Sequence, residues 1–233
     1  MSIIKSNMTA PPPPTGGALS SIGEMNSLRY HPSIGSINYT LQNAGHSTDH
    51  TISVWLKLCG FDTTFQEVIQ LAVEPTTSRA FHLNEGKIKF SVGGGATIGS
   101  KGVLRDFSAW YHVVGSRSAS ESKLWLNGVL QETASVTGTS DFATQGIKMS
   151  IGKGILNNYM NAWPLLSTTY FSDLNYVDGI ALPPTAFGEE ISGVWVPKAY
   201  SGAYGANGFH LDFADSGNIG NDVSGRGNHW TVN

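Results

Sequence analysis

Hydrophobic and polar residues alternate in short runs along most of the chain after residue 27. In residues 51–58, Ile52, Val54, Leu56 and Leu58 fall on one face of an extended chain. Residues 87–92 repeat this alternation. A period of two is typical of half-buried β-strands. Further β-rich runs predict more strands at residues 66–73, 110–114, 148–151, 169–177 and 209–213.

The sharpest local signal is Asn127-Gly128, which separates two apolar runs within residues 123–130. A type I′ turn needs positive φ at both central residues, and Asn-Gly adopts it readily. This pattern therefore predicts a tight β-hairpin. The Ser- and Thr-rich stretch at residues 133–140 predicts a surface loop.

Many short strands punctuated by Gly, Asn and Asp predict an all-β fold, a two-sheet antiparallel sandwich or jelly roll. Long amphipathic helical patterns are absent from the sequence. One helical turn is expected at residues 183–187, where an early proline suits a helix start. We assign the sandwich to residues 23–233.

Residues 1–22 differ from the rest and are predicted to form an extended N-terminal arm. Pro11, Pro12, Pro13 and Pro14 favour a polyproline II conformation without internal hydrogen bonds. Terminal segments become ordered only when something holds them. We favour docking of this arm on a neighbouring subunit over docking on its own domain.

Charge and composition narrow the function classes. Charged residues make up 13% of the 233 residues and the net charge is −3. A weakly charged polar surface suits a protein that sits against neighbours. No basic run favours nucleic acid, and no apolar run approaches the ~20 residues of a membrane span. The single cysteine, Cys59, excludes an internal disulfide and is compatible with synthesis in a reducing cytoplasm.

The central part of the chain resembles a laminin-G-like or concanavalin-A-like jelly roll. The resemblance rests on an ordered series of motifs: TISVWLK at 51–57, WYHVV at 110–114, KLWLNGV at 123–129 and SIG at 150–152. The flanks, SLRY at 27–30, LNYVDGIALP at 174–183 and GVWVPKAYSG at 193–202, resemble this domain in bacteriophage proteins, especially phages of aquatic bacteria. So do residues 205–213 and 220–232.

Catalytic patterns are not apparent, so we predict a non-enzymatic protein. The E-x-D-x-x-E strand of sandwich-fold hydrolases does not occur. Glu189 and Glu190 are adjacent and would point to opposite sides of an extended chain. His46 and His50 have the spacing of a helical zinc motif, but they precede a strand, which favours a polar loop.

No cofactor is predicted. The acids Asp212, Asp215 and Asp222 lie among asparagines near the C-terminus, and such oxygen ligands are the type that calcium prefers. Turns in which Asp and Asn side chains bond their own backbone explain them without an ion. We favour these turns over calcium.

Aromatic residues in loop-rich regions are the best candidates for ligand or subunit contact, because exposed rings stack on sugars and are enriched at interfaces. Trp55, Trp110 and Trp125 lie within predicted strands and are expected in the core or on a sheet face. The loop aromatics are Tyr159, Trp163, Trp195, Tyr200 and Tyr204.

The phage resemblance implies a virion structural protein. Phage proteins with this domain are often longer, whereas this sequence shows only the domain and a short arm, which resembles a capsid decoration or cement protein. The expected partners are the major capsid protein or another virion protein, and further copies of the chain, with a trimer favoured. The alternative is a tail-fibre or adhesin module that recognises host surface glycans.

Overall fold

The computed structural model describes residues 25–31, 36–60, 65–73, 76–91, 93, 97–151 and 168–232. Strands dominate these residues, with two short 3₁₀ turns, η1 (Asp141–Ala143) and η2 (Pro184–Ala186). All strand pairings are antiparallel. Within this part of the chain, no helix is long and apolar enough to cross a membrane.

Sheet 1 is a seven-stranded sheet in the order β1-β12-β3-β8-β9-β10, with β15 beside β12. Its long central strands come from distant parts of the sequence, so the sheet depends on non-local pairing. The strands are β1 (Leu28–Tyr30), β12 (Thr169–Asp178), β3 (His50–Leu58), β8 (Tyr111–Arg117), β9 (Glu121–Leu126), β10 (Val129–Ser135) and β15 (Phe209–Leu211).

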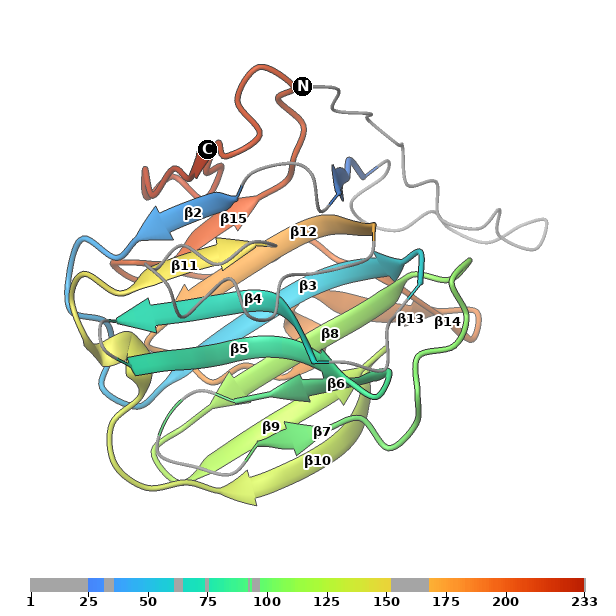
Figure 1. Cartoon of the computed structure of the whole chain (residues 1–233), viewed down its shortest axis with the longest axis horizontal. Coiled ribbons are helices and arrows are strands. Elements are labelled where there is room, and N and C mark those ends of the chain that lie inside the picture. Colours follow the sequence, from blue (N-terminus) through green and yellow to red (C-terminus); the bar gives the residue numbers. More distant parts are fainter. Residues whose placement is uncertain are drawn as a thin grey trace.

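Sheet 2 is also seven-stranded, in the order β16-β2-β11-β4-β5-β6-β7. The two sheets face each other as a sandwich (Figure 1). The strands of sheet 2 are β16 (Thr231–Val232), β2 (Ile37–Thr40), β11 (Lys148–Ile151), β4 (Gln66–Val73), β5 (Thr76–Asn84), β6 (Lys87–Phe90) and β7 (Ile98–Gly99).

The core between the sheets follows from the period-two pattern. Ile52, Val54, Leu56 and Leu58 of β3 are fully buried and pack in the same cluster as residues of sheet 2. Burying a side chain of this size contributes about 1.5–3 kcal/mol, so the alternation specifies which face of each strand turns inward. The predicted all-β sandwich is confirmed.

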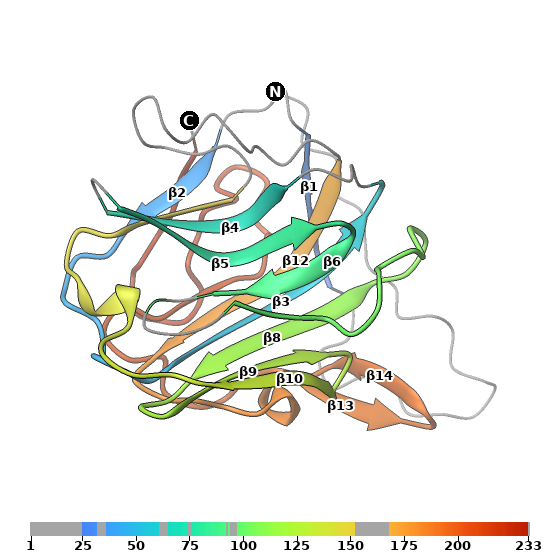
Figure 2. The same cartoon turned by 60° about the horizontal axis from the view of Figure 1, so that its bottom comes forward.

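The outer face of sheet 1 is covered, which the alternation did not predict. The polar side of β3 is also buried, and Lys57 is its most exposed residue. The cover includes a separate two-stranded hairpin, β13 (Gly188–Ile191) and β14 (Val194–Pro197), which lies beneath β9 and β10 in Figure 2. Strands expected to be half-buried are therefore buried on both faces.

The predicted Asn-Gly hairpin is confirmed. Asn127 and Gly128 have φ of 48° and 77°, as a type I′ turn requires, and join β9 to β10. The loop predicted at residues 133–140 is wrong at its start, because β10 continues to Ser135. β10 is an edge strand and largely exposed, so polar residues are tolerated there. The arm at residues 1–22, with Pro11–Pro14, lies outside the described residues, and its boundary stays a prediction.

Candidate functional site

Trp195 attaches the β13–β14 hairpin to sheet 1. Its Nε1 donates a hydrogen bond to His112 Nδ1 at 2.9 Å, with the ring centroids 6.0 Å apart and the ring planes 23° apart, so the two rings meet edge to edge. Two glycines leave room for the indole: a Cβ added at Gly128 would lie 2.7 Å from Trp195 Cε3, and one at Gly188 would lie 2.6 Å from Cε2. This ring therefore fixes the hairpin against the β9–β10 turn.

His112, which accepts this hydrogen bond, is held neutral. Burial lowers the pKa of His112 to about 3. Because the Trp195 N–H can only donate, Nδ1 must accept, which leaves the ring proton on Nε2 to bond Ser53 Oγ at 2.8 Å. Trp55 stacks on the imidazole, with centroids 4.7 Å apart. The outer face of sheet 1 is thus a packed aromatic layer here.

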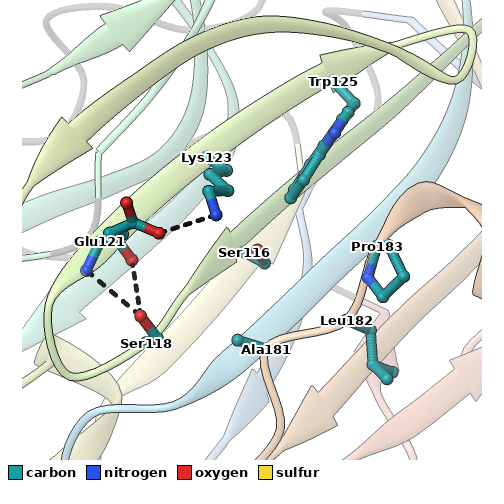
Figure 3. A pocket seen from close by; sticks show the side chains of 8 residues that line it. All are labelled: Ser116, Ser118, Glu121, Lys123, Trp125, Ala181, Leu182 and Pro183. Carbon is teal, nitrogen blue, oxygen red and sulfur yellow. Dashed lines mark hydrogen bonds and ion pairs between the residues drawn. The ribbon is translucent and has the colours of Figure 1, made fainter.

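Beside this layer lies a groove of about 270 Å³, between the outer face of β8–β9 and the segment at residues 181–183 (Figure 3). Alternation in β9 sends Leu124 to the core and leaves Lys123 and Trp125 on the outer face. Register places Ser116 of β8 opposite Lys123. The groove is lined by Ser116, Ser118, Glu121, Lys123, Trp125, Ala181, Leu182 and Pro183.

The far wall of the groove is held in place by Thr51 on the outer face of β3. Its Oγ1 donates to Ile180 O at 2.8 Å and accepts from Leu182 N at 2.8 Å. Thr51 is buried, so both bonds are shielded from water. The wall is thereby tied to the same sheet that carries the floor.

The groove combines an aromatic face with unused polar groups. Trp125 is partly exposed, and within the described residues neither its indole N–H nor the Ser116 hydroxyl has a hydrogen-bond partner. Lys123 Nζ lies 2.7 Å from Glu121 Oε2, and both side chains are well exposed. Such an exposed pair is worth only about 0–1 kcal/mol, so either group can exchange its partner for a ligand.

Glu121 is the single carboxyl group among the residues that line this groove. A retaining glycosidase needs two carboxyls about 5–5.5 Å apart, and an inverting one needs two at a larger separation. The groove offers contacts for a polyhydroxylated ligand but lacks the second carboxyl group of either mechanism.

A family model described as the concanavalin A-like lectin/glucanases superfamily matches residues 35–163, more than half of the chain. The chain belongs to this superfamily. The laminin-G-like resemblance of its motifs is therefore confirmed. No curated protein sequence matches the chain.

Solved structures similar to this superfamily member include the receptor binding domain of botulinum neurotoxin mosaic serotype C/D. That domain is 12% identical, with a TM-score of 0.51 over 79% of this chain and 44% of its own. A heptameric SAP-like pentraxin from Limulus polyphemus is 16% identical over 66% and 73% of the two chains, with a TM-score of 0.48. The Trypanosoma rangeli sialidase is 12% identical over 69% and 26%, with a TM-score of 0.47. This chain spans less than half of the neurotoxin domain, and such identities show the fold alone.

The loop aromatics that are described serve packing inside this superfamily domain. Trp195 holds the hairpin, and Tyr200 donates to Ala203 O while packing against Phe187. Burial raises the pKa of Tyr204, so its hydroxyl stays protonated and donates to Asn175 Oδ1 at 2.7 Å. Their predicted ligand contacts stay untested. Two other candidates lie outside the described residues, Tyr159 and Trp163.

The candidate calcium acids bond their own loops. Asp222 accepts from the backbone N–H groups of His210, Ser224 and Asn228. Asp212 accepts from Ala214 N, and the exposed Asp215 accepts from the amides two and three residues ahead. In the described part of the chain, no three His, Cys, Asp or Glu side chains are grouped so that they could hold a metal ion.

The His46–His50 pair does not converge. His46 is exposed and its Nδ1 accepts from Asp49 N, whereas His50 is fully buried in β3 and packs on Phe142. The predicted polar loop is found at residues 46–49, and the strand begins at His50.

The sequence analysis placed Trp125 on a strand but did not mark it as a candidate contact residue. It was expected in the core or on a sheet face, and it lies on the outer sheet face. The alternation within KLWLNG already carried the signal, because Trp125 falls opposite the two inward leucines, Leu124 and Leu126. No pattern in the sequence indicated that residues 181–183 would form the opposite wall of the groove.

Proposed function

We propose that this chain is a non-catalytic carbohydrate-binding domain and that the Trp125 groove is its ligand site. One observation carries the proposal: a partly exposed indole with a free N–H stands in a groove beside an unbonded hydroxyl and a weak ion pair. A sugar ring has an apolar face for the indole and hydroxyl groups for the polar neighbours.

The chemistry of the lining supports a neutral or weakly charged glycan. Glu121 and Lys123 compensate each other at 2.7 Å, so the groove has no strong charge of either sign. Glu121 accepts hydrogen bonds, and Lys123 donates them. Membership in a superfamily named for lectins and glucanases and a fold like that of a toxin receptor-binding domain are consistent with glycan recognition.

The absence of catalysis is part of the proposal. A single carboxyl lines the groove, so bond cleavage by a carboxyl pair is not expected there. Incubation with a bound polysaccharide should release no new reducing ends. Release of reducing ends that disappears in Glu121→Gln would contradict this part of the proposal.

The binding proposal is tested on an array of bacterial surface glycans, followed by titration with the strongest binder. Trp125→Ala should weaken binding about tenfold or more, because the ring supplies the stacking surface. Phe107→Ala removes another exposed aromatic ring that does not line the groove and should bind as the unaltered chain does. No binding to any glycan, or full binding by Trp125→Ala, would count against the groove.

We further propose that the domain is carried on a virus particle, with capsid decoration favoured over the tail. Support comes from the phage-like flanks of the sequence and from the low charged fraction of 13%. Residues 1–22 would attach the domain to the major capsid protein or to a neighbouring copy in a homo-oligomer, with a trimer favoured. An arm that binds only the assembled shell stabilises that shell by mass action.

Deletion of residues 1–22 tests the virion role. The truncated chain should keep the circular dichroism spectrum of a folded sandwich but fail to sediment with particles. Normal attachment of the truncated chain would remove the arm from the proposal. Electron microscopy of particles would then give the location and copy number directly.

A further inference from the structure

A β-bulge in β12 places Asp173 in an unusual position on the outer face of sheet 1. The pairing with β3 passes from Ser172 opposite Trp55 to Asn175 opposite Ser53, so Asp173 and Leu174 together face one residue. Asp173 has a φ of 47°, in the left-handed region that non-glycine residues rarely occupy. Bulges and strained residues of this kind re-aim side chains at functional sites.

The Asp173 carboxylate is buried and only half satisfied. Its side chain is 8% exposed, and Oδ1 lies 2.7 Å from His210 Nε2 on β15. Oδ2 is shielded from water and has no hydrogen-bond partner among the described residues. An unsatisfied buried carboxylate oxygen is uncommon in folded proteins and sets Asp173 apart from an ordinary structural acid.

Asp173 lines a cavity of about 260 Å³ that is separate from the Trp125 groove. Asp212 contributes a second carboxyl group, whose Oδ1 also accepts from Ala214 N. Met25 and Ala199 add apolar surface suited to a carbon skeleton. The complete lining is Met25, Asn26, Ser172, Asp173, Ala199, His210 and Asp212.

The charges around this cavity favour a cation. Burial lowers the pKa of His210, but the hydrogen bond and charge of Asp173, with Asp212 and Asp222, outweigh it and leave the pKa raised. The three carboxylates carry more negative charge than one protonated imidazole can offset. The cavity is larger than an ion needs, and the described residues hold no ligand group suited to a metal. An organic cation fits both observations.

We propose that the cavity of Asp173, His210 and Asp212 is a second binding site, which takes a small ligand bearing a primary ammonium group. The ammonium donates to the carboxylates of Asp173 and Asp212, and the carbon skeleton contacts Met25 and Ala199. An amino sugar and a lysine side chain of a partner protein share this chemistry. The site is distinct from the groove proposed for glycans.

Nuclear magnetic resonance of the labelled full chain at pH 6.5 and low salt tests the proposal. The probes are D-glucosamine and Nα-acetyllysine amide, which represent the two sources, and N-acetylglucosamine, the uncharged counterpart of the first. Saturable shifts of the His210 ring signals are expected with at least one amine and not with N-acetylglucosamine. Shifts with glucosamine alone would indicate an amino sugar as the natural ligand. Shifts with the lysine analogue would indicate a lysine side chain of a protein partner.

Asp173→Asn is the decisive variant, since asparagine tolerates the left-handed backbone and keeps an acceptor for His210. It should weaken binding of the amine about tenfold or more. Asp212→Asn should do the same, because each substitution removes a charged acceptor. Asp215→Asn, the same charge change outside the cavity, and Trp125→Ala should bind normally. If Asp173→Asn does not fold, Asp212→Asn decides.

Three results would overturn the proposal. The first is that neither amine shifts the His210 signals. The second is that N-acetylglucosamine shifts them with the affinity of glucosamine. The third is that the folded Asp173→Asn and Asp212→Asn variants bind as tightly as the unaltered chain.

Discussion

Acidification should destabilise the domain through His112. The imidazole is fully buried, stacks on Trp55, and accepts the Trp195 N–H at Nδ1. Protonation would put a second donor against that N–H and a charge in an apolar layer. The folded chain therefore keeps His112 neutral as the pH falls, whereas the unfolded chain binds a proton.

The size of the effect follows from the pKa difference. The folded pKa of about 3 lies below the ordinary value of 6.5, so this contribution to stability is complete above pH 6.5 and is lost as the pH falls toward 3. At pH 4.5 the unfolded histidine has gained its proton over two pH units. At about 1.4 kcal/mol per unit, His112 lowers the free energy of unfolding by about 3 kcal/mol.

Urea denaturation at pH 7.5 and pH 4.5 measures this loss. His112→Gln cannot titrate, so the difference in the free energy of unfolding between the two pH values should shrink by about 3 kcal/mol relative to the unaltered chain. Comparing differences removes the constant loss of stability that the substitution causes. His31→Gln, which removes an exposed histidine, is the matched control.

An unchanged pH difference in His112→Gln would refute the reasoning, because the acid sensitivity would then come from other groups. His50 offers an internal check. It is also fully buried, and burial together with Arg117 and His46 lowers its pKa to about 3. His50→Gln should reduce the pH difference by a similar amount, and the two reductions should add.

Two further predictions concern buried contacts. Arg117→Met should lower the free energy of unfolding by about 3 kcal/mol in urea, because the buried guanidinium donates to the carbonyl oxygens of Thr48 and Gly138; a loss below 1 kcal/mol would show that water replaces it. Gly128→Ala should cost about 1–2 kcal/mol for its positive φ and more for the contact with Trp195. Faster amide exchange in β13–β14 would report the loosened hairpin, and unchanged exchange would argue against this contact as its anchor.

Local patterns predicted the strands and their inward faces well. The alternation of Ile52, Val54, Leu56 and Leu58 specified one face of β3, and Asn127-Gly128 specified a turn. These features depend on neighbours within a few residues, which is the range over which sequence patterns are informative.

Features formed by contacts between distant segments were not predicted from the sequence. Nothing in the residues around Thr51 indicates that Ile180 and Leu182 bond to it and cover the strand. The bulge at Asp173 is a pairing irregularity between β12 and β3, so neither strand reveals it alone. Both candidate sites depend on such contacts, which explains why the sequence pattern did not indicate them.

The indole of Trp195 has a consequence for how a ligand would meet the Trp125 groove. It touches the turn that follows Trp125 and also the start of β13, soon after the opposite wall. Both sides of the groove are thus braced by one rigid ring and by the two bonds of Thr51. A receptor shaped in advance loses little conformational freedom on association, so a sugar should bind without rearranging the backbone.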